Sequence, residues 1–202
     1  MFVVGITGGI GCGKSQVSQV FREKGALVLD ADEVSRRMTD VDGRALPAVR
    51  ELLGSSFFHK DGSLNRKLVA ETVFSNKKLL DEYSRIIHKE VLDEMGETID
   101  AENKKGTKLV VMDVPIPVKR GFVDVCNQVL VISCDDELRL RRLTERGMSE
   151  LDARRRMAMQ MSREEYEELS DFVIDNSGSL SALEEQVNVY ISAELGKRGI
   201  RI

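Results

Sequence analysis

The sequence has no long hydrophobic run, no excess of positive charge and few cysteines. No apolar segment approaches the ~20 residues that span a bilayer, so a membrane-spanning helix is excluded. The net charge of −4 excludes a general attraction to nucleic acid or to an anionic membrane surface. The three cysteines, Cys12, Cys126 and Cys134, lack the paired spacing of a zinc site or a disulfide framework.

The N-terminus does not resemble a signal peptide, because a basic leader followed by an apolar core is missing. Together with the odd number of cysteines, this predicts a reducing, cytoplasmic location. The sequence also has no internal repeat and no low-complexity linker. Its 202 residues are enough for one sizeable domain, or for one core domain with insertions.

What the sequence does have is the glycine-rich segment GITGGIGCGKSQ, which begins at Gly5. From Gly8 it reads G-x-x-x-x-G-K-S, the pattern of a phosphate-binding loop. Glycines let the main chain approach a ligand closely, and successive N–H groups then form a concave anion site. Lys14 can reach the β- and γ-phosphates, and Ser15 can place its hydroxyl on Mg²⁺. The residues of this segment predicted to bind ATP are Gly8, Gly9, Gly11, Cys12, Gly13, Lys14, Ser15 and Gln16.

The residues around the loop support this interpretation. Residues 2–6 are apolar and rich in β-branched side chains, which is typical of a buried parallel strand. After the loop, Val17, Val20 and Phe21 recur at helical spacing. Strand, loop and helix in this order is the context that the motif requires. Cys12 has two interpretations: a thiolate at a helix N-terminus allows redox sensing, whereas a small residue is simply tolerated at this place in the loop.

Further short strands are predicted within residues 26–30, 108–115, 128–134 and 171–178, with helical segments between them. Strands that alternate with helices indicate an α/β fold. We predict a P-loop kinase-like, doubly wound parallel five-stranded sheet with an inserted helical substrate subdomain and a helical lid. In this single domain of residues 1–202, the core comprises 1–32, 108–135 and 171–202, the insertion 33–107, and the arginine-rich lid 136–170.

Three carboxylates are expected at the carboxyl ends of strands, where open parallel sheets bind their ligands. Asp32 is the candidate to orient an acceptor hydroxyl or to take its proton, because it is expected to end the strand nearest the first. Asp30 is a competitor that caps or binds metal-bound water. Asp113 ends the third strand and could hold Mg²⁺ through water. Each of them could instead be a turn or helix-capping residue.

Phosphoryl transfer also needs cations around the transferring group. The segment after Cys134 contains eight arginines, most of which are expected on a solvated helix face beside acidic partners such as Glu145, Glu150 and Glu164. One or two of them are expected to stabilise the transferring charge and to exclude water as part of a mobile lid. The candidates are Arg142, Arg146 and Arg156.

Several segments in a fixed order resemble the bacterial dephospho-CoA kinase family nearly end to end. They are GITGGIGCGKS, VLDADEV, DGSLNRKLVAETVFSN followed by IIHKEV, VPIPV, RRLTERGMSE with RRRMAMQMSREE, and DFVIDNSGSL. The resemblance implies transfer of the γ-phosphate of ATP to the ribose 3′-hydroxyl of dephospho-CoA, in the last step of coenzyme A synthesis.

The same resemblance implies roles for individual residues. Asp32 would lie near the acceptor hydroxyl, and Lys14, Arg142 and Arg146 would stabilise the transferring charge. His88, which its own position in a helix leaves unassigned, would belong to the substrate subdomain. Asn176 would lie near the adenine of ATP. The implied partners are ATP, Mg²⁺ and dephospho-CoA, with no nucleic acid and no membrane, and the chain would be a monomer or a small homo-oligomer.

The sequence departs from the family pattern at Gln16, Lys89, residues 116–119 and Tyr166. None of these departures changes the glycines, Lys14 or Asp32 of the proposed site. Pro117 and Lys119 stand where the family usually has a leucine and an acidic residue, and Lys119 with Arg120 could meet substrate phosphates instead. Two other functions remain open: a kinase of another small nucleoside or nucleotide acceptor, and a regulator that binds ATP without transferring phosphate.

Overall fold

The computed structural model describes residues 1–115, 117 and 122–202. The described strands are β1 (Phe2–Thr7), β2 (Leu27–Asp30), β3 (Leu109–Asp113), β4 (Gln128–Ser133) and β5 (Phe172–Asp175). They form one five-stranded sheet in the order β2-β3-β1-β4-β5, and every described pairing is parallel. The predicted doubly wound α/β fold is therefore confirmed, with each strand within the predicted segment or within two residues of its ends.

The described α-helices are α1 (Lys14–Glu23), α2 (Ala31–Met38), α3 (Leu46–Leu53), α4 (Arg66–Phe74), α5 (Lys77–Lys105), α6 (Asp136–Glu145), α7 (Glu150–Ala158), α8 (Arg163–Glu168) and α9 (Leu180–Tyr190). Serines begin three of them: Ser149, Ser162 and Ser179 each accept a hydrogen bond from the backbone three residues later. The predicted closing helix is longer than α9 alone, because a π-helical turn over Ile191–Leu195 continues it.

The chain divides into two compact units, Met1–Asp30 with Glu102–Ile202, and Ala31–Ala101. The first holds the sheet, α1 and α6 to α9, and the second holds α2, α3, α4 and most of α5. Within the second unit, Arg37 bonds Glu94 at 2.7 Å and Arg44 bonds Glu97 at 2.8 Å, so charge pairs link its N-terminal segment to α5. The predicted boundaries of the insertion, 33 and 107, stay a prediction.

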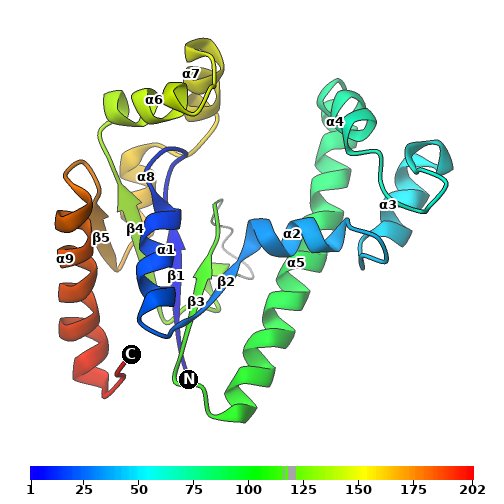
Figure 1. The fold of residues 1–202 in the computed structure, drawn as a ribbon. Helices are drawn as coiled ribbons and strands as arrows, with labels where there is room; N and C mark the ends of the chain where they lie inside the picture. The colour runs from blue at the N-terminus through cyan, green and yellow to red at the C-terminus, as the bar shows by residue number, and fades with distance from the viewer. Residues whose placement is uncertain (116, 118–121) are drawn as a thin grey trace. The chain divides into compact units, whose positions relative to one another are not determined.

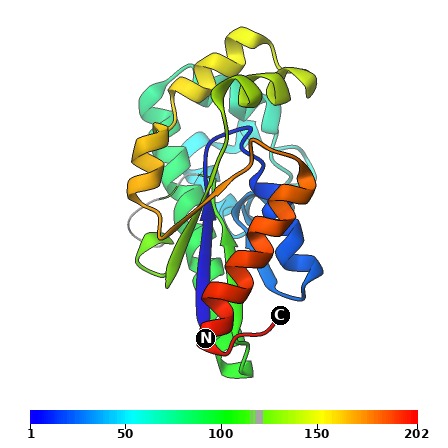
Figure 2. The same cartoon turned by 90° about the vertical axis from the view of Figure 1, so that its left-hand side faces the viewer.

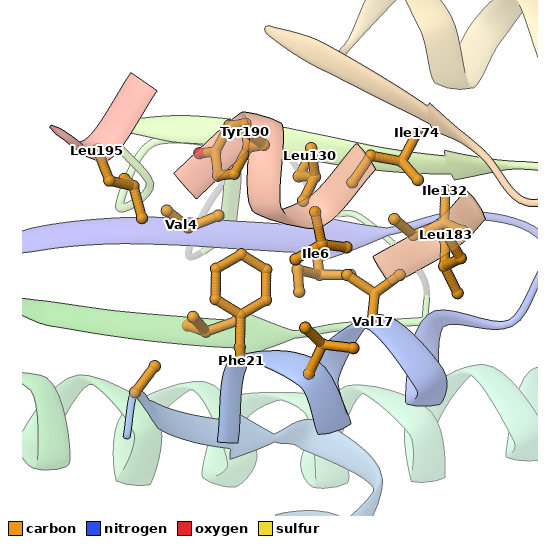
Figure 3. Close-up of a cluster of buried hydrophobic side chains, with 14 of the residues drawn as sticks. Val4, Ile6, Val17, Phe21, Leu130, Ile132, Ile174, Leu183, Tyr190 and Leu195 are labelled. Atoms are coloured by element: carbon orange, nitrogen blue, oxygen red, sulfur yellow. The ribbon is translucent and has the colours of Figure 1, made fainter. Parts of the chain in front are cut away.

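The core of the first unit lies between the sheet and two helices, α1 and α9, which cover the same face (Figures 1 and 2). Figure 3 shows Phe21 of α1 and Tyr190 of α9 pointing at Val4 and Ile6 of β1. The Phe21 and Tyr190 rings meet edge to face with centroids 6.3 Å apart. Helical spacing brings the apolar residues of both helices onto one face, so the start of α1 is fixed against the end of β1.

The structure also shows where the loops of the first unit gather. β1 leads into the glycine-rich loop, and β4 leads into α6 and α7, so both connections leave the carboxyl ends of their strands (Figure 1). Parallel strands bring these ends to one edge of the sheet, which is where such folds place their ligands.

Among the described residues, no helix is both long enough and apolar enough to cross a membrane.

Replacing Phe21 with alanine tests the proposed anchor of α1. The ring is fully buried, so the substitution should lower the free energy of unfolding by about 3–5 kcal/mol, measured by urea denaturation. Val189 lies on the same two-helix layer but is 53% exposed, and Val189→Ala should change stability by less than about 0.5 kcal/mol. Equal losses for the two variants would contradict the packing described above.

Candidate nucleotide site

The glycine-rich loop joins β1 to α1 and carries three glycines with positive φ: Gly8 at 147°, Gly11 at 82° and Gly13 at 89°. Gly13 caps α1 in the left-handed conformation, which side chains with a Cβ disfavour. A Cβ on Gly8 would also collide with the carbonyl oxygen of Ile132 in β4. The helix N-terminus that follows presents the positive end of its dipole to the space in front of the loop.

Side chains outside the loop bind the carbonyl groups of its peptides. Arg139 Nε donates to the carbonyl oxygen of Ile10 at 3.0 Å, and Asn176 Nδ2 donates to that of Cys12 at 2.8 Å. A trans peptide points its N–H opposite to its C=O. The N–H groups of Gly11 and Gly13 therefore face away from these donors. No described residue accepts a hydrogen bond from either group.

Lys14 and Ser15 lie at the start of α1, as the motif requires. Lys14 Nζ donates to the carbonyl oxygen of Gly8 at 2.9 Å, so its ammonium group returns to the first residue of the loop. Ser15 is exposed. The Lys14 ammonium group is therefore on the loop side of the helix end, and the predicted role of Ser15 toward Mg²⁺ stays a prediction.

Asp113 ends β3 beside the loop. It is 6% exposed and accepts a hydrogen bond from Ser18 Oγ at 2.6 Å. In the sheet it pairs in register with Ile6 of β1 and with Asp30 of β2. The Asp30 carboxylate forms an ion pair with Arg22, with 3.9 Å between Oδ2 and Nη2. Of the two, Asp113 is the carboxylate on the strand next to β1.

Asp32 does not end a strand, and the strand before it is not next to β1, so the prediction that Asp32 ends the strand nearest β1 is wrong. β3 lies between β2 and β1, and β2 ends at Asp30. Asp32 is in the first turn of α2, which starts directly after the strand. Asp32 belongs to the second unit, as does His88, which is exposed on α5. The roles predicted for these two residues stay predictions.

The candidate arginines differ in their surroundings. Arg142 is half-buried: it donates to the carbonyl oxygen of Asn176 at 3.0 Å and lies 3.5 Å from that of Gly11. Arg146 and Arg156 are exposed. The expected pairs of exposed arginines with acids occur for Arg141 with Glu145 and Arg154 with Glu150, whereas Arg163 pairs with Glu167 rather than Glu164.

The side-chain amide of Asn176, the residue expected near adenine, bonds to the loop and to α1. Nδ2 donates to the Cys12 carbonyl and, at 3.2 Å, to Gln16 Oε1. The residue is 2% exposed. These bonds tie the end of β5 to the loop and to the first turn of α1, and a role toward the base stays a prediction.

Two further contacts to the loop were not predicted from the sequence. Arg139, which the sequence groups with the solvated arginines, is 8% exposed, and the sequence assigns no role to Gln160. Gln160 Oε1 accepts a hydrogen bond from the N–H of Ile10 at 2.7 Å. One signal was available for Arg139: it stands three residues before Arg142 and therefore shares a face of α6 with it. Gln160, between helices, carried no such signal.

The residues that depart from the family pattern differ in their surroundings. Lys89 is exposed and pairs with Asp93 at 2.9 Å. Tyr166 is 5% exposed, and burial raises the pKa of its hydroxyl. Lys119 and Arg120, the residues predicted to meet substrate phosphates, lie outside the described residues.

The comparisons with known proteins agree with one another. A sequence model described as dephospho-CoA kinase matches residues 2–182. A dephospho-CoA kinase from Corynebacterium jeikeium is 37% identical over 191 residues, covering 93% of this chain and 97% of that protein. One from Cutibacterium acnes is 38% identical, covering 92% and 81% respectively.

Solved structures extend the likeness to the fold. The Thermus thermophilus protein TT1252 has a TM-score of 0.79 and 28% identity, covering 96% of this chain and 97% of that one. A dephospho-CoA kinase from Campylobacter jejuni has a TM-score of 0.72 and 23% identity, covering 98% of both chains. A shikimate kinase from Acinetobacter baumannii, at 0.55 and 16%, covers 98% of this chain and 95% of its own, and shares the fold alone.

The thiol of Cys12 gives a test of the redox-sensing interpretation. Burial raises the pKa of this thiol above its ordinary value, and the opposing effect of the Arg139 charge is smaller. Since the thiolate is the reactive form, alkylation of Cys12 by iodoacetamide at pH 7.5 should be slower than in the urea-unfolded chain and should accelerate as the pH is raised. Peptide mass spectrometry of the labelled native protein measures the rate. Faster labelling of Cys12 in the native chain would support a sensor.

Proposed function

The chain belongs to the dephospho-CoA kinase family, and we propose that it transfers the γ-phosphate of ATP to the ribose 3′-hydroxyl of dephospho-CoA, giving CoA and ADP. The observation that carries the donor half is the pair of N–H groups on Gly11 and Gly13, turned away from Arg139 and Asn176. Such groups are the natural partners of phosphate oxygens at a helix N-terminus. The acceptor half rests on the family.

Binding of the triphosphate would rearrange the contact between Lys14 and Gly8. Lys14 Nζ would leave the Gly8 carbonyl, now 2.9 Å away, for the β- and γ-phosphate oxygens. Its charge would then lie where negative charge develops during transfer. The loop already has the glycine conformations that the motif requires, so its backbone would need little reorganisation.

The oxygen groups near the loop fit Mg²⁺. Among the described residues no cluster of three or more His, Cys, Asp or Glu side chains could hold a metal ion by itself. Mg²⁺ does not need one, since it binds through one or two protein oxygens together with phosphates and water. Ser15 Oγ would be a direct ligand, and Asp113 would act through water. The ion would neutralise charge on the phosphates.

The acceptor hydroxyl would be oriented by Asp32. A carboxylate within hydrogen-bond reach of that hydroxyl can take its proton as the oxygen attacks the γ-phosphorus. His88 would contribute to substrate binding in the second unit. Arg146, exposed at the end of α6, would supply positive charge to the transferring group. Arg142, which bonds to the carbonyl group of Asn176, would add its charge from the protein side of the loop.

The decisive experiment measures ATP consumption with Mg²⁺, with and without dephospho-CoA, and identifies the product. We expect consumption that depends on dephospho-CoA and a product with one added phosphate at the ribose 3′ position. ATP binding without CoA formation would overturn the proposal. Transfer to another small nucleoside or nucleotide would then identify a different kinase, and no transfer to any acceptor would identify a regulator.

Asp32→Asn tests the proposed proton acceptor. The amide cannot take a proton, so kcat should fall by about 10²–10⁴-fold while the dissociation constant for ATP changes little. Glu33→Gln is the matched control, because Glu33 is the neighbouring acid in the same first turn of α2. If ATP affinity collapses and kcat survives in Asp32→Asn, then Asp32 is a binding residue instead.

Arg146→Ala tests the proposed lid cation. Without its charge and bulk near the reacting phosphate, water should compete better with the acceptor. The ratio of ATP hydrolysed to CoA formed should therefore rise by several-fold. Arg154→Ala is the control, because Arg154 pairs with Glu150 at 2.8 Å on an exposed helix face. An unchanged ratio in Arg146→Ala would place Arg146 on the solvated surface too.

A further inference from the structure

We propose that Arg139 and Gln160 are positioning residues that together clamp the backbone of Ile10 and so hold the phosphate loop in its binding shape. The inference deepens the proposed function, and it rests only on the nucleotide-binding half of it. Both side chains come from the segment between β4 and β5, which is more than 120 residues away from the loop in sequence: 129 for Arg139 and 150 for Gln160.

The two contacts fix neighbouring peptides of the loop. Gln160 Oε1 accepts from the N–H of Ile10 at 2.7 Å, which sets the Gly9–Ile10 peptide. Arg139 Nε donates to the carbonyl of Ile10 at 3.0 Å, which sets the Ile10–Gly11 peptide. Since the peptides before and after Ile10 are both held, the two bonds restrict its φ and ψ angles. Ile10 lies between glycines in a loop that otherwise has wide conformational freedom.

The orientation of each peptide decides which amide faces the phosphates. The bond to Gln160 takes the Ile10 N–H out of the set that could bind an anion. The bond to Arg139 turns the Gly11 N–H, on the same peptide, in the opposite direction. The clamp therefore selects the Gly11 amide for phosphate binding. Without the clamp, these peptides would become ordered only when ATP binds, and the lost conformational entropy would weaken binding.

Arg139 is itself held firmly. Its Nη1 also bonds Asp136 Oδ1 at 2.7 Å. Its Nη2 lies so close to Gly9 that a Cβ on that residue would collide with it. Nη2 is buried and has no hydrogen-bond partner among the described residues. A charge buried in this way is screened poorly by solvent, so it adds to the attraction of the loop for a polyanion.

Gln160 is the better position for a test, because it is half-buried and its replacement leaves no buried charge unpaired. Gln160→Met keeps the length of the side chain and removes the acceptor. Met159→Ala is the matched control, because Met159 is the adjacent residue and is 86% exposed. The melting temperature of each nucleotide-free variant shows whether the fold survives.

The experiment is calorimetric binding of ATP with Mg²⁺ in the absence of any acceptor. One lost hydrogen bond to the loop should weaken binding by about three- to tenfold in Gln160→Met. Met159→Ala should bind as the wild type does. In turnover assays, KM for ATP should rise while kcat at saturating ATP is retained, and the nucleotide-free melting temperature should stay that of the control. Binding does not depend on dephospho-CoA, so this result is independent of which acceptor is used.

Two outcomes would overturn the clamp. Unchanged affinity in Gln160→Met would mean that the contact does not hold the loop. Tighter binding would mean that Gln160 competes with the phosphates for the Ile10 amide. Arg139→Lys, which keeps a positive charge but lacks Nε, gives a second test. If the two residues act on the same backbone, the loss of affinity in the double variant should be smaller than the product of the two single losses.

Discussion

The phosphate loop depends on one constraint: each of its peptides has two polar ends, and only one can face the anion. Amides that point toward phosphate leave carbonyl groups that point away and need donors of their own. Here Arg139 and Asn176 supply two of those donors, and Arg142 lies at the limit of hydrogen-bond distance from a third carbonyl. The binding surface in front of the loop is therefore determined by the side chains behind it.

This constraint changes how the arginine-rich segment is understood. A lid is usually considered for what it presents to the substrate, and Arg146 and Arg156 fit that view because they are exposed. Arg139 and Arg142 lie on α6, and Arg146 follows the last residue of the same helix. Arg139 and Arg142 nevertheless face the loop: Arg139 bonds to its backbone, and Arg142 bonds to the backbone of Asn176 beside it. One short helix thus combines a face that supports the loop with a face that is exposed to solvent.

The sequence was a good guide wherever local physics decides the structure. β-branched runs predicted the strands, helical spacing predicted α1 and α9, and the glycines with Lys14 and Ser15 predicted the loop. It was a poor guide to spatial order. The place of β3 between β1 and β2, which undid the argument for Asp32, follows from how the strands cross over and not from any one strand's residues.

The supporting contacts were missed for a related reason. Arg139 and Gln160 bond to backbone atoms of the loop, and any residue offers the same backbone atoms, so no pattern of residue types marks the pairing. The resemblance names a ligand for Asn176 but gives no sign that its side-chain amide also bonds to the loop. Motifs report the side chains that touch ligands more clearly than those that touch the main chain.

The contact between Asn176 and Cys12 spans 164 residues and has a consequence for biosynthesis. A ribosome releases the whole phosphate-binding motif at the outset, but the side chains that orient its peptides follow only with the final third of the chain. A nascent chain that ends before β5 carries the motif without this support. The peptides of the loop therefore gain these fixed orientations only late in synthesis, after the residues of the loop itself have long been made.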